Sequence, residues 1–267
     1  MRRVAIACAV AAFFLGAVSV HAQTWNIQIV DDAGSTGYAS RIAITSDNTP
    51  YIFYMTQAYW AWMAKWVPSG EGGGWDKWPL GYSVPYYRRC GFVAGPGDSL
   101  HLATSRSSPS RIDYNIYNTN TQVWDVSGEM VAGEVGDISM ALIDSAGVVI
   151  PTIVFAAYII PRHVQFARRD PGTGIWTVQL VFDATNAENP AIAIDSAYHA
   201  HVCFYESTGN NLMYATNAGG TWVSEYVDIV GDVGQYCAIA IDAGDIPYIV
   251  YYDATNDDLK YARMVAP

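Results

Sequence analysis

The chain is built from short runs of alternating or continuously apolar residues, separated by glycine, asparagine, aspartate and proline. Residues 238–242 read Ala-Ile-Ala-Ile-Asp, and residues 247–253 read Pro-Tyr-Ile-Val-Tyr-Tyr-Asp. Runs of this length with a period of two are typical of β-strands. No stretch after residue 22 carries the sustained 3.6-residue period of an amphipathic helix. The pattern therefore predicts an all-β fold.

These runs recur as five copies of one unit. Each copy has a strand led by tryptophan, a small apolar strand, an aromatic-rich strand and a strand similar to Leu-Lys-Tyr-Ala. The leading tryptophans, at positions 25, 75, 124, 176 and 222, are 50, 49, 52 and 46 residues apart. Four strands in about 40–50 residues is the size of one propeller blade. We therefore predict a five-bladed β-propeller, with four antiparallel strands per blade, over residues 23–267. A solenoid is the alternative, although its turns are usually shorter.

The composition of the strands predicts their order within a blade. The Ala-Ile-Ala-Ile strand is uniformly small and apolar, as a strand crowded around the central axis should be, so we place it innermost and the tryptophan strand outermost. In this order the Trp25 strand has no blade of its own. We expect residues 24–30 to pair with residues 259–262 as the fourth strand of the last blade, which removes a free sheet edge. Asp144, Asp195 and Asp242, which end three inner strands, are expected to form turns through side-chain-to-backbone hydrogen bonds.

The first 22 residues have the pattern of an export signal. Arg2 and Arg3 precede an apolar run that ends near residue 20, and small residues frame a cleavage site between Ala22 and Gln23. A retained membrane anchor is the alternative, but the run is short for a span. We expect a secreted or periplasmic mature chain with no membrane insertion.

Charge and cysteine content narrow the possible partners. With 51% hydrophobic and 15% charged residues, the chain is neither disordered nor a coiled coil. After cleavage, 12 basic and 25 acidic residues give a net charge of −13, which argues against nucleic acid. Cys90, Cys203 and Cys237 remain, an odd number that leaves at least one thiol free, without metal-ligand spacing. We expect buried thiols, or one disulfide as the alternative, no metal or cofactor, and a monomer, although a free thiol leaves dimerisation open.

The repeats resemble those of secreted bacterial β-propeller proteins, distant relatives of the sialidase-like Asp-box families. Residues 217–222, Asn-Ala-Gly-Gly-Thr-Trp, are similar to a degenerate Asp-box turn, which in those families joins the third and fourth strands of a blade. The architecture is also like that of five-bladed tachylectin-type propellers. The resemblance covers residues 24–267 and implies a fold but no activity, because no active-site motif of the propeller glycosidases is found.

The loops that enter the innermost strands share one face of the predicted propeller and form its mouth. Equivalent positions there carry different side chains, which indicates either an unconstrained rim or one asymmetric ligand site. Aromatic faces cover the C–H patches of sugars, and planar polar groups reach their hydroxyls, so carbohydrate is the predicted ligand. The predicted ligand-binding residues are Tyr38, Tyr87, Arg88, Asp137, Glu188, Asn189, Gln235 and Tyr236.

Other interpretations of the same residues stay open. Asp137 and Glu188, on adjacent blades, are candidates for the paired carboxylates of a glycoside hydrolase. A protein-interaction scaffold is a third possibility. His101 and His201 occupy the same repeat position and are expected to be packed side chains. A tryptophan cluster predicts packing between the first two blades or, alternatively, an exposed patch for a glycan or a protein. Its members are Trp60, Trp62, Trp66, Trp75 and Trp78.

Overall fold

The computed structural model describes residues 27–68, 73–84, 90–107, 110–133, 136–157, 162–183 and 186–265. These residues form strands, turns and one short 3₁₀ helix, η2 (Pro96–Asp98). Nowhere in these ranges is a helix long and apolar enough to cross a membrane. The predicted export signal and Trp25 lie outside the described residues.

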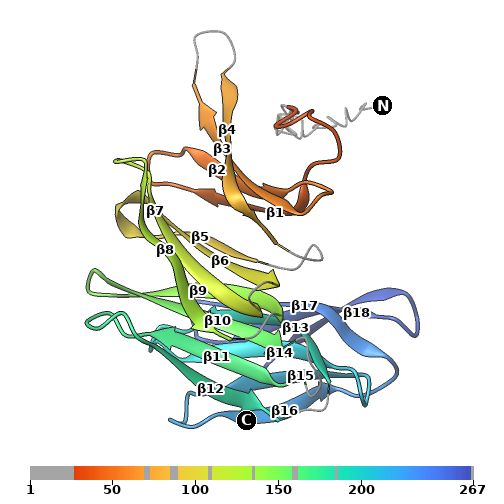
Figure 1. The fold of residues 1–267 in the computed structure, drawn as a ribbon. Helices are drawn as coiled ribbons and strands as arrows, with labels where there is room; N and C mark the ends of the chain where they lie inside the picture. The colour runs from red at the N-terminus through yellow and green to blue at the C-terminus, as the bar shows by residue number, and fades with distance from the viewer. Residues whose placement is uncertain are drawn as a thin grey trace, which may run out of the picture.

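The strands form five antiparallel sheets, one for each repeat (Figure 1), which confirms the five-bladed β-propeller. The first sheet holds β1 (Tyr38–Ile44), β2 (Pro50–Met55), β3 (Trp60–Val67) and β4 (Gly74–Ser83). The second holds β5 (Gly91–Ala94), β6 (Ser99–Ser107), β7 (Ser110–Asn118) and β8 (Val123–Ala132). The third holds β9 (Gly136–Ser145), β10 (Val148–Ala157), β11 (Val164–Arg169) and β12 (Trp176–Phe182). The fourth holds β13 (Ala187–Ile194), β14 (Ala200–Glu206), β15 (Asn211–Thr216) and β16 (Val223–Asp228). The fifth holds β17 (Val233–Ile241), β18 (Pro247–Asp253) and β19 (Asp258–Arg263).

The predicted order of strands within a blade is confirmed. The first strand of each sheet contacts the first strand of the next, from β1 through β5, β9 and β13 to β17. Small residues allow this close approach around the axis. A Cβ atom added to Gly91 of β5, for example, would lie 2.4 Å from the Cβ of Met140 in β9.

Apolar side chains pack between neighbouring sheets and form the core. Phe53 and Met63 of the first blade join Phe92 and Leu100 of the second, and similar clusters fill the next three junctions. In the buried strands, the side chains on both faces therefore pack against neighbouring blades, and β14 is an example because all of its residues are buried.

The predicted turn-forming aspartates are also confirmed. Asp195 Oδ1 accepts hydrogen bonds from the backbone N–H groups of residues 197 and 199, at 2.9 and 2.7 Å. Asp242 Oδ1 accepts equivalent bonds from residues 244 and 246, and Asp144 Oδ1 accepts one from residue 147. These bonds satisfy backbone donors at the tight turn between the first and second strands of a blade.

The last sheet departs from the prediction, because it holds three strands among the residues that the structure describes. Ile27–Val30, the described part of the predicted closing segment, forms no strand, and the side chains of Ile27 and Ile29 are 90% and 78% exposed. Asp31 holds this part of the chain at the first blade, since its carboxylate accepts hydrogen bonds from Tyr54 Oη and Lys77 Nζ. The described residues therefore include no closing strand, and none of them pairs with the outer edge of β19.

Candidate functional site

The mouth residues that the structure describes lie at the starts of the inner strands. Tyr38 begins β1, Asp137 is the second residue of β9, and Gln235 lies near the start of β17. Glu188 and Asn189 lie in the same place in β13. Tyr87 and Arg88 lie outside the described residues. Because the inner strands run in the same direction around the axis, the starts of these strands lie at the same end of the propeller.

Three of the inner strands carry the same irregularity at the mouth. Ala39, Asn189 and Tyr236 have φ angles of 48°, 54° and 54°, and the pairing register shifts at each of them. An extra residue in the left-handed region forms a β-bulge and re-aims the neighbouring side chains. In the third blade β9 pairs regularly with β10, so Asp137 keeps ordinary strand geometry.

A network of polar side chains connects the fourth and fifth blades at the mouth. Tyr205 Oη donates to Asp232 Oδ1 at 2.7 Å, and Gln235 Nε2 donates to the same carboxylate at 3.1 Å. Burial, followed by the hydrogen bond to Asp232, raises the pKa of the Tyr205 hydroxyl. Tyr236 is 63% exposed beside this network. The mouth therefore combines an accessible aromatic ring with oriented donors and acceptors.

The two predicted carboxylates have different surroundings. Glu188 forms an ion pair with Arg162, which lies just before β11 in the third blade. Asp137 pairs with Ala156 across the sheet, and no other described residue forms an ion pair with it. The arginine holds the Glu188 carboxylate as a hydrogen-bond acceptor, an arrangement that suits ligand binding at least as well as proton transfer.

Below the mouth, residues adjacent to the predicted site line one cavity near the axis. It has a volume of about 150 Å³ and receives residues from four blades, including Arg41, Cys90, Ile138 and Pro190. Arg41 crosses part of it, because its Nε donates to the carbonyl of Cys90 at 3.2 Å. The starts of the first four inner strands are thus brought together around a small polar space.

A second candidate site is a groove between the first two blades, and Trp78 is the one member of the predicted tryptophan cluster that lines it. Trp78 of β4 and Trp124 of β8 both contact Tyr117 of β7, with ring centroids 5.8 and 5.2 Å from it. The cavity at these rings has a volume of about 540 Å³. Burial raises the pKa of the Tyr117 hydroxyl, with smaller contributions from Tyr51 and Asp76. We call this cavity the aromatic groove.

Polar side chains border the aromatic groove. Lys65 and Asp76 contribute from the first blade, and Gln122 contributes from the turn before β8. Lysine donates hydrogen bonds, aspartate accepts them, and glutamine does both. The groove therefore offers an aromatic wall together with groups that can orient hydroxyls.

The predicted tryptophan cluster divides into separate environments. Trp66 and Trp75 form an edge-to-face pair across the β3–β4 hairpin, with centroids 5.4 Å apart, and Trp78 packs between the blades. Trp60 is 50% exposed. Packing between the first two blades is confirmed for Trp78, while Trp60 lies at the surface.

At the next junction an indole closes the corresponding space. Trp176 of β12 contacts Tyr114 of β7 edge-to-face at 5.1 Å, and its Nε1 donates to Glu129 Oε1 at 2.5 Å. Arg169 donates to both oxygens of the same carboxylate, at 2.9 and 3.1 Å. The ion pair and the ring together occupy this junction.

The histidines are packed side chains, as predicted. His101 and His201 are 3% and 6% exposed, and each ring contacts the hydroxyl of a tyrosine, Tyr114 or Tyr214, through Nδ1. Burial lowers the pKa of His101 to about 4, so its imidazole is neutral at pH 7.

Cys90, Cys203 and Cys237 are buried thiols. Cys203 Sγ and Cys237 Sγ lie 2.7 Å apart, between β14 and β17. Within the described ranges, no group of three or more His, Cys, Asp or Glu side chains is arranged to hold a metal ion.

Comparison with known proteins finds similarity in structure alone. No protein-family description and no curated protein sequence match the chain. The SapL1 lectin in complex with alpha methyl fucoside is similar with a TM-score of 0.59 and 16% identity, over 85% of this chain and 77% of that chain. The Aleuria aurantia lectin in complex with Fucα1-6GlcNAc gives 0.56 and 10%, over 86% and 79%. A polysaccharide lyase acting on ulvan gives 0.57 and 11%, over 83% and 65%. At these identities the likeness shows a shared propeller fold.

Proposed function

We propose that this protein is a carbohydrate-binding propeller and that the aromatic groove is a site for a sugar. The observation that carries the proposal is the aromatic wall of Trp78, Tyr117 and Trp124, bordered by Lys65 and Asp76 in one cavity. Aromatic faces cover the apolar side of a pyranose, and a mixed set of donors and acceptors fixes its hydroxyls. The presence of sugar ligands in similar propeller lectins supports this choice of ligand.

The mouth is the second candidate location for the sugar. It was predicted from Tyr38, Tyr87, Arg88, Asp137, Glu188, Asn189, Gln235 and Tyr236. The exposed ring of Tyr236 and the oriented amide of Gln235 support it. Because the mouth and the aromatic groove use different residues, single substitutions separate them.

A glycan array followed by calorimetry on the mature chain tests the proposal. We expect a bound glycan whose affinity falls about fivefold in Trp124→Ala, because one stacking contact contributes about 1 kcal/mol. Trp60→Ala is the matched control, since Trp60 is exposed and lies outside the groove. If Trp124→Ala and Lys65→Ala retain full affinity while Tyr236→Ala loses it, the site is at the mouth. If no glycan binds, the proposed function is wrong.

Polysaccharide cleavage is the competing activity, supported by the likeness in fold to a polysaccharide lyase. It is tested by incubating the chain with a panel of polysaccharides and measuring new chain ends. Hydrolysis that disappears in Asp137→Asn and Glu188→Gln would assign these carboxylates as an acid–base pair.

We also propose that the chain is exported after cleavage between Ala22 and Gln23 and acts as a monomer. The charged, apolar and small-residue regions before Gln23 support export. Mass spectrometry of the protein recovered outside the cytoplasm gives the cleavage site, and ultracentrifugation gives the mass in solution.

A further inference from the structure

The mouth end of the junction between the first and second blades carries a pair of opposed arginines. Gly91 at the start of β5 pairs with Ala103, and β6 and β7 continue beyond this point as a hairpin in which Arg106 lies directly opposite Arg111. Like charges directly opposite each other on two strands destabilise a sheet. Natural proteins break such local rules mainly at functional sites, so this pair is a candidate for one.

One buried carboxylate holds both guanidinium groups. Asp113 is 2% exposed, and its Oδ2 lies 2.7 Å from Arg106 Nε, while its Oδ1 lies 2.6 Å from Arg111 Nε. The Arg106 guanidinium also lies over the ring of Tyr82, with Cζ 4.8 Å from the ring centroid. These contacts fix where the two guanidinium groups lie. We call Arg106 and Arg111, held by Asp113, the arginine fork.

The arginine fork carries more positive charge than Asp113 neutralises. Two guanidinium groups face one carboxylate, and no other described carboxylate pairs with either arginine. Asp113 binds each arginine mainly through Nε, and no described residue accepts a hydrogen bond from the terminal nitrogens of Arg106. The two arginine side chains are 30% and 26% exposed. The fork therefore presents charged donors that an anion in solution can reach.

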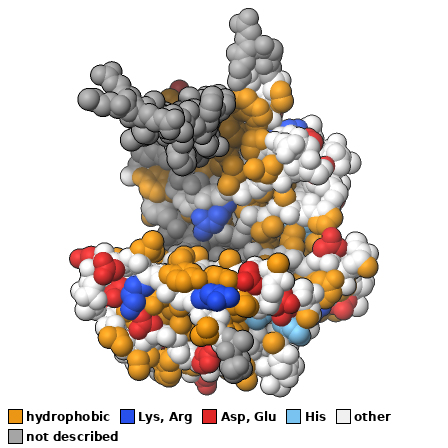
Figure 2. Space-filling view, turned by 180° about the vertical axis from the view of Figure 1, so that it is seen from behind, with side chains coloured by type: hydrophobic (Ala, Val, Ile, Leu, Met, Phe, Trp, Pro, Cys, Tyr) orange, Lys and Arg blue, Asp and Glu red, His pale blue; other side chains and the backbone are white. Residues whose placement is uncertain are grey.

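A third arginine lies at the same end of this junction. Arg41 Nε donates to the carbonyl of Cys90, the residue before β5, and no described carboxylate pairs with Arg41. The chain as a whole has a net charge of −11, and Figure 2 shows acidic side chains spread over the lower part of the molecule. The mouth end of the first junction is therefore a local region of positive charge on an acidic protein.

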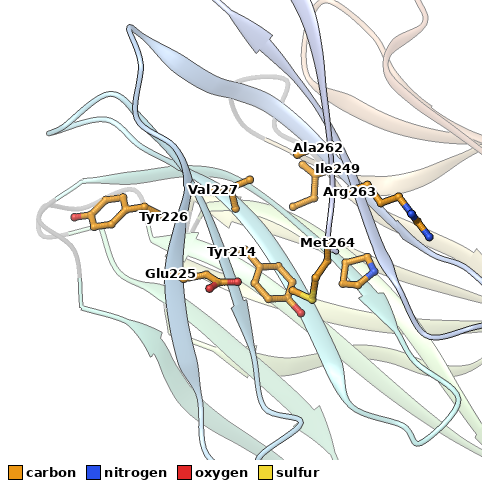
Figure 3. A pocket seen from close by; sticks show the side chains of 9 residues that line it. Tyr214, Glu225, Tyr226, Val227, Ile249, Ala262, Arg263 and Met264 are labelled. Carbon is orange, nitrogen blue, oxygen red and sulfur yellow. The ribbon is translucent and has the colours of Figure 1, made fainter. Parts of the chain in front are cut away.

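Arginines at two other junctions are matched to single partners. Arg169 pairs with Glu129 between the second and third blades. Arg263 borders the cavity between the fourth and fifth blades (Figure 3), where its Nε donates to Tyr248 Oη at 2.9 Å. The surplus of positive charge distinguishes the arginine fork from both of these sites.

We propose that the arginine fork binds an oxyanion carried on a polysaccharide, either a sulfate ester or the carboxylate of a uronic acid. The inference rests on the proposed function, because it assigns an acidic class of glycan to a carbohydrate-binding propeller. Planar guanidinium groups donate paired hydrogen bonds to carboxylates and similar oxyanions. Since Asp113 occupies the Nε atoms, the bound anion takes the terminal nitrogens and offsets the repulsion between Arg106 and Arg111.

The arginine fork and the aromatic groove are far enough apart to be tested separately. Arg111 and Tyr117 lie on the same face of β7, six residues apart. At about 3.3 Å per residue, this separation is about 20 Å. Substitutions at Arg106 or Arg111 therefore report on the fork, and Trp124→Ala reports on the groove.

Calorimetric titration of the full mature chain with dextran sulfate, polygalacturonate and uncharged dextran tests the fork. The titrations use an ionic strength of about 0.15 M, at which the net negative charge of the chain is largely screened. We expect at least one charged polymer to bind, and the one that binds distinguishes sulfate from carboxylate. Arg106→Gln and Arg111→Gln should each weaken binding on the order of tenfold, because charged hydrogen-bond donors are lost. In each variant the other arginine still pairs with Asp113, and Arg263→Gln is the matched control that should bind like the unchanged chain.

Inorganic sulfate distinguishes a defined site from general attraction between charges. Sodium sulfate should displace the bound polymer at a lower concentration than sodium chloride of equal ionic strength, and this difference should disappear when Arg106→Gln and Arg111→Gln are combined. The proposal is overturned if neither charged polymer binds, or if Arg263→Gln weakens binding as much as Arg106→Gln. Loss of neutral-glycan binding in Trp124→Ala, with no charged polymer bound, would overturn the fork and leave the proposed function standing.

Discussion

The ion pair at the junction of the second and third blades gives a quantitative stability prediction. Glu129 accepts three hydrogen bonds, two from Arg169 and one from Trp176, and the charged side chains are 25% and 20% exposed. Hydrogen bonds to charged groups contribute about 1.5–3 kcal/mol each when buried, and exposed ion pairs contribute about 0–1 kcal/mol. With partial exposure, we expect Glu129→Ala to lower the free energy of unfolding by about 2 kcal/mol.

Gln179→Ala is the matched comparison, because Gln179 accepts one hydrogen bond from Trp222 and carries no charge. A single neutral hydrogen bond contributes about 1 kcal/mol. Calorimetric melting should therefore show a decrease of about 4–8 °C for Glu129→Ala and about half of that for Gln179→Ala. If Glu129→Ala melts within 1 °C of the unchanged chain, on the order of experimental scatter, the ion pair contributes nothing measurable and the reasoning fails.

Three further predictions concern other parts of the fold. The pKa of the His101 imidazole is lowered from 6.5 to about 4, so as pH falls the unfolded chain binds a proton at this residue before the folded chain does. The free energy of unfolding should therefore decrease by up to about 3 kcal/mol as pH falls from 6.5 to about 4. An NMR titration midpoint near 6.5 for His101 in the folded chain would contradict this. In denaturant titrations, Gly136→Ala should lower the free energy of unfolding by about 3 kcal/mol or more, because the new Cβ would lie 1.8 Å from a backbone oxygen of β10. Gly133→Ala is the control, since a Cβ there would lie in open space, and it should change the free energy of unfolding by less than about 0.5 kcal/mol. Refolding with a low-molecular-weight disulfide as oxidant should link Cys203 to Cys237 and leave Cys90 as a thiol, because the first two sulfurs are 2.7 Å apart; peptide mapping that finds Cys90 in a bridge would refute this.

The blade architecture was predictable because each repeat signals itself locally. The Ala-Ile-Ala-Ile strands have the small apolar residues expected of strands that pack around the central axis. Asp195 and Asp242 follow these strands and form turns through hydrogen bonds to backbone N–H groups two residues away. Because His101 and His201 occupy the same position in their repeats, the alignment of the repeats also predicted that both side chains are packed. Local periodicity and turn chemistry are therefore enough to order the strands of a blade.

Features that depend on contacts between blades were not predictable in the same way. The aromatic groove brings Lys65 of one blade to Gln122 of the next, and no sequence period marks that pairing. The bulges at Asn189 and Tyr236 add one residue without changing the apolar pattern on either side. The expected closing strand depends on where the first blade lies relative to the last, which local patterns do not specify.

The bulges at the mouth limit how this protein can be engineered. A residue other than glycine in the left-handed region costs about 1 kcal/mol, so glycine at Ala39 or Tyr236 would relieve backbone strain. Selection for heat resistance alone would therefore favour glycine at these positions. At Tyr236 the same change removes an exposed ring from the rim. Thermostabilised variants of this propeller should accordingly be screened for lost recognition whenever they gain glycine there.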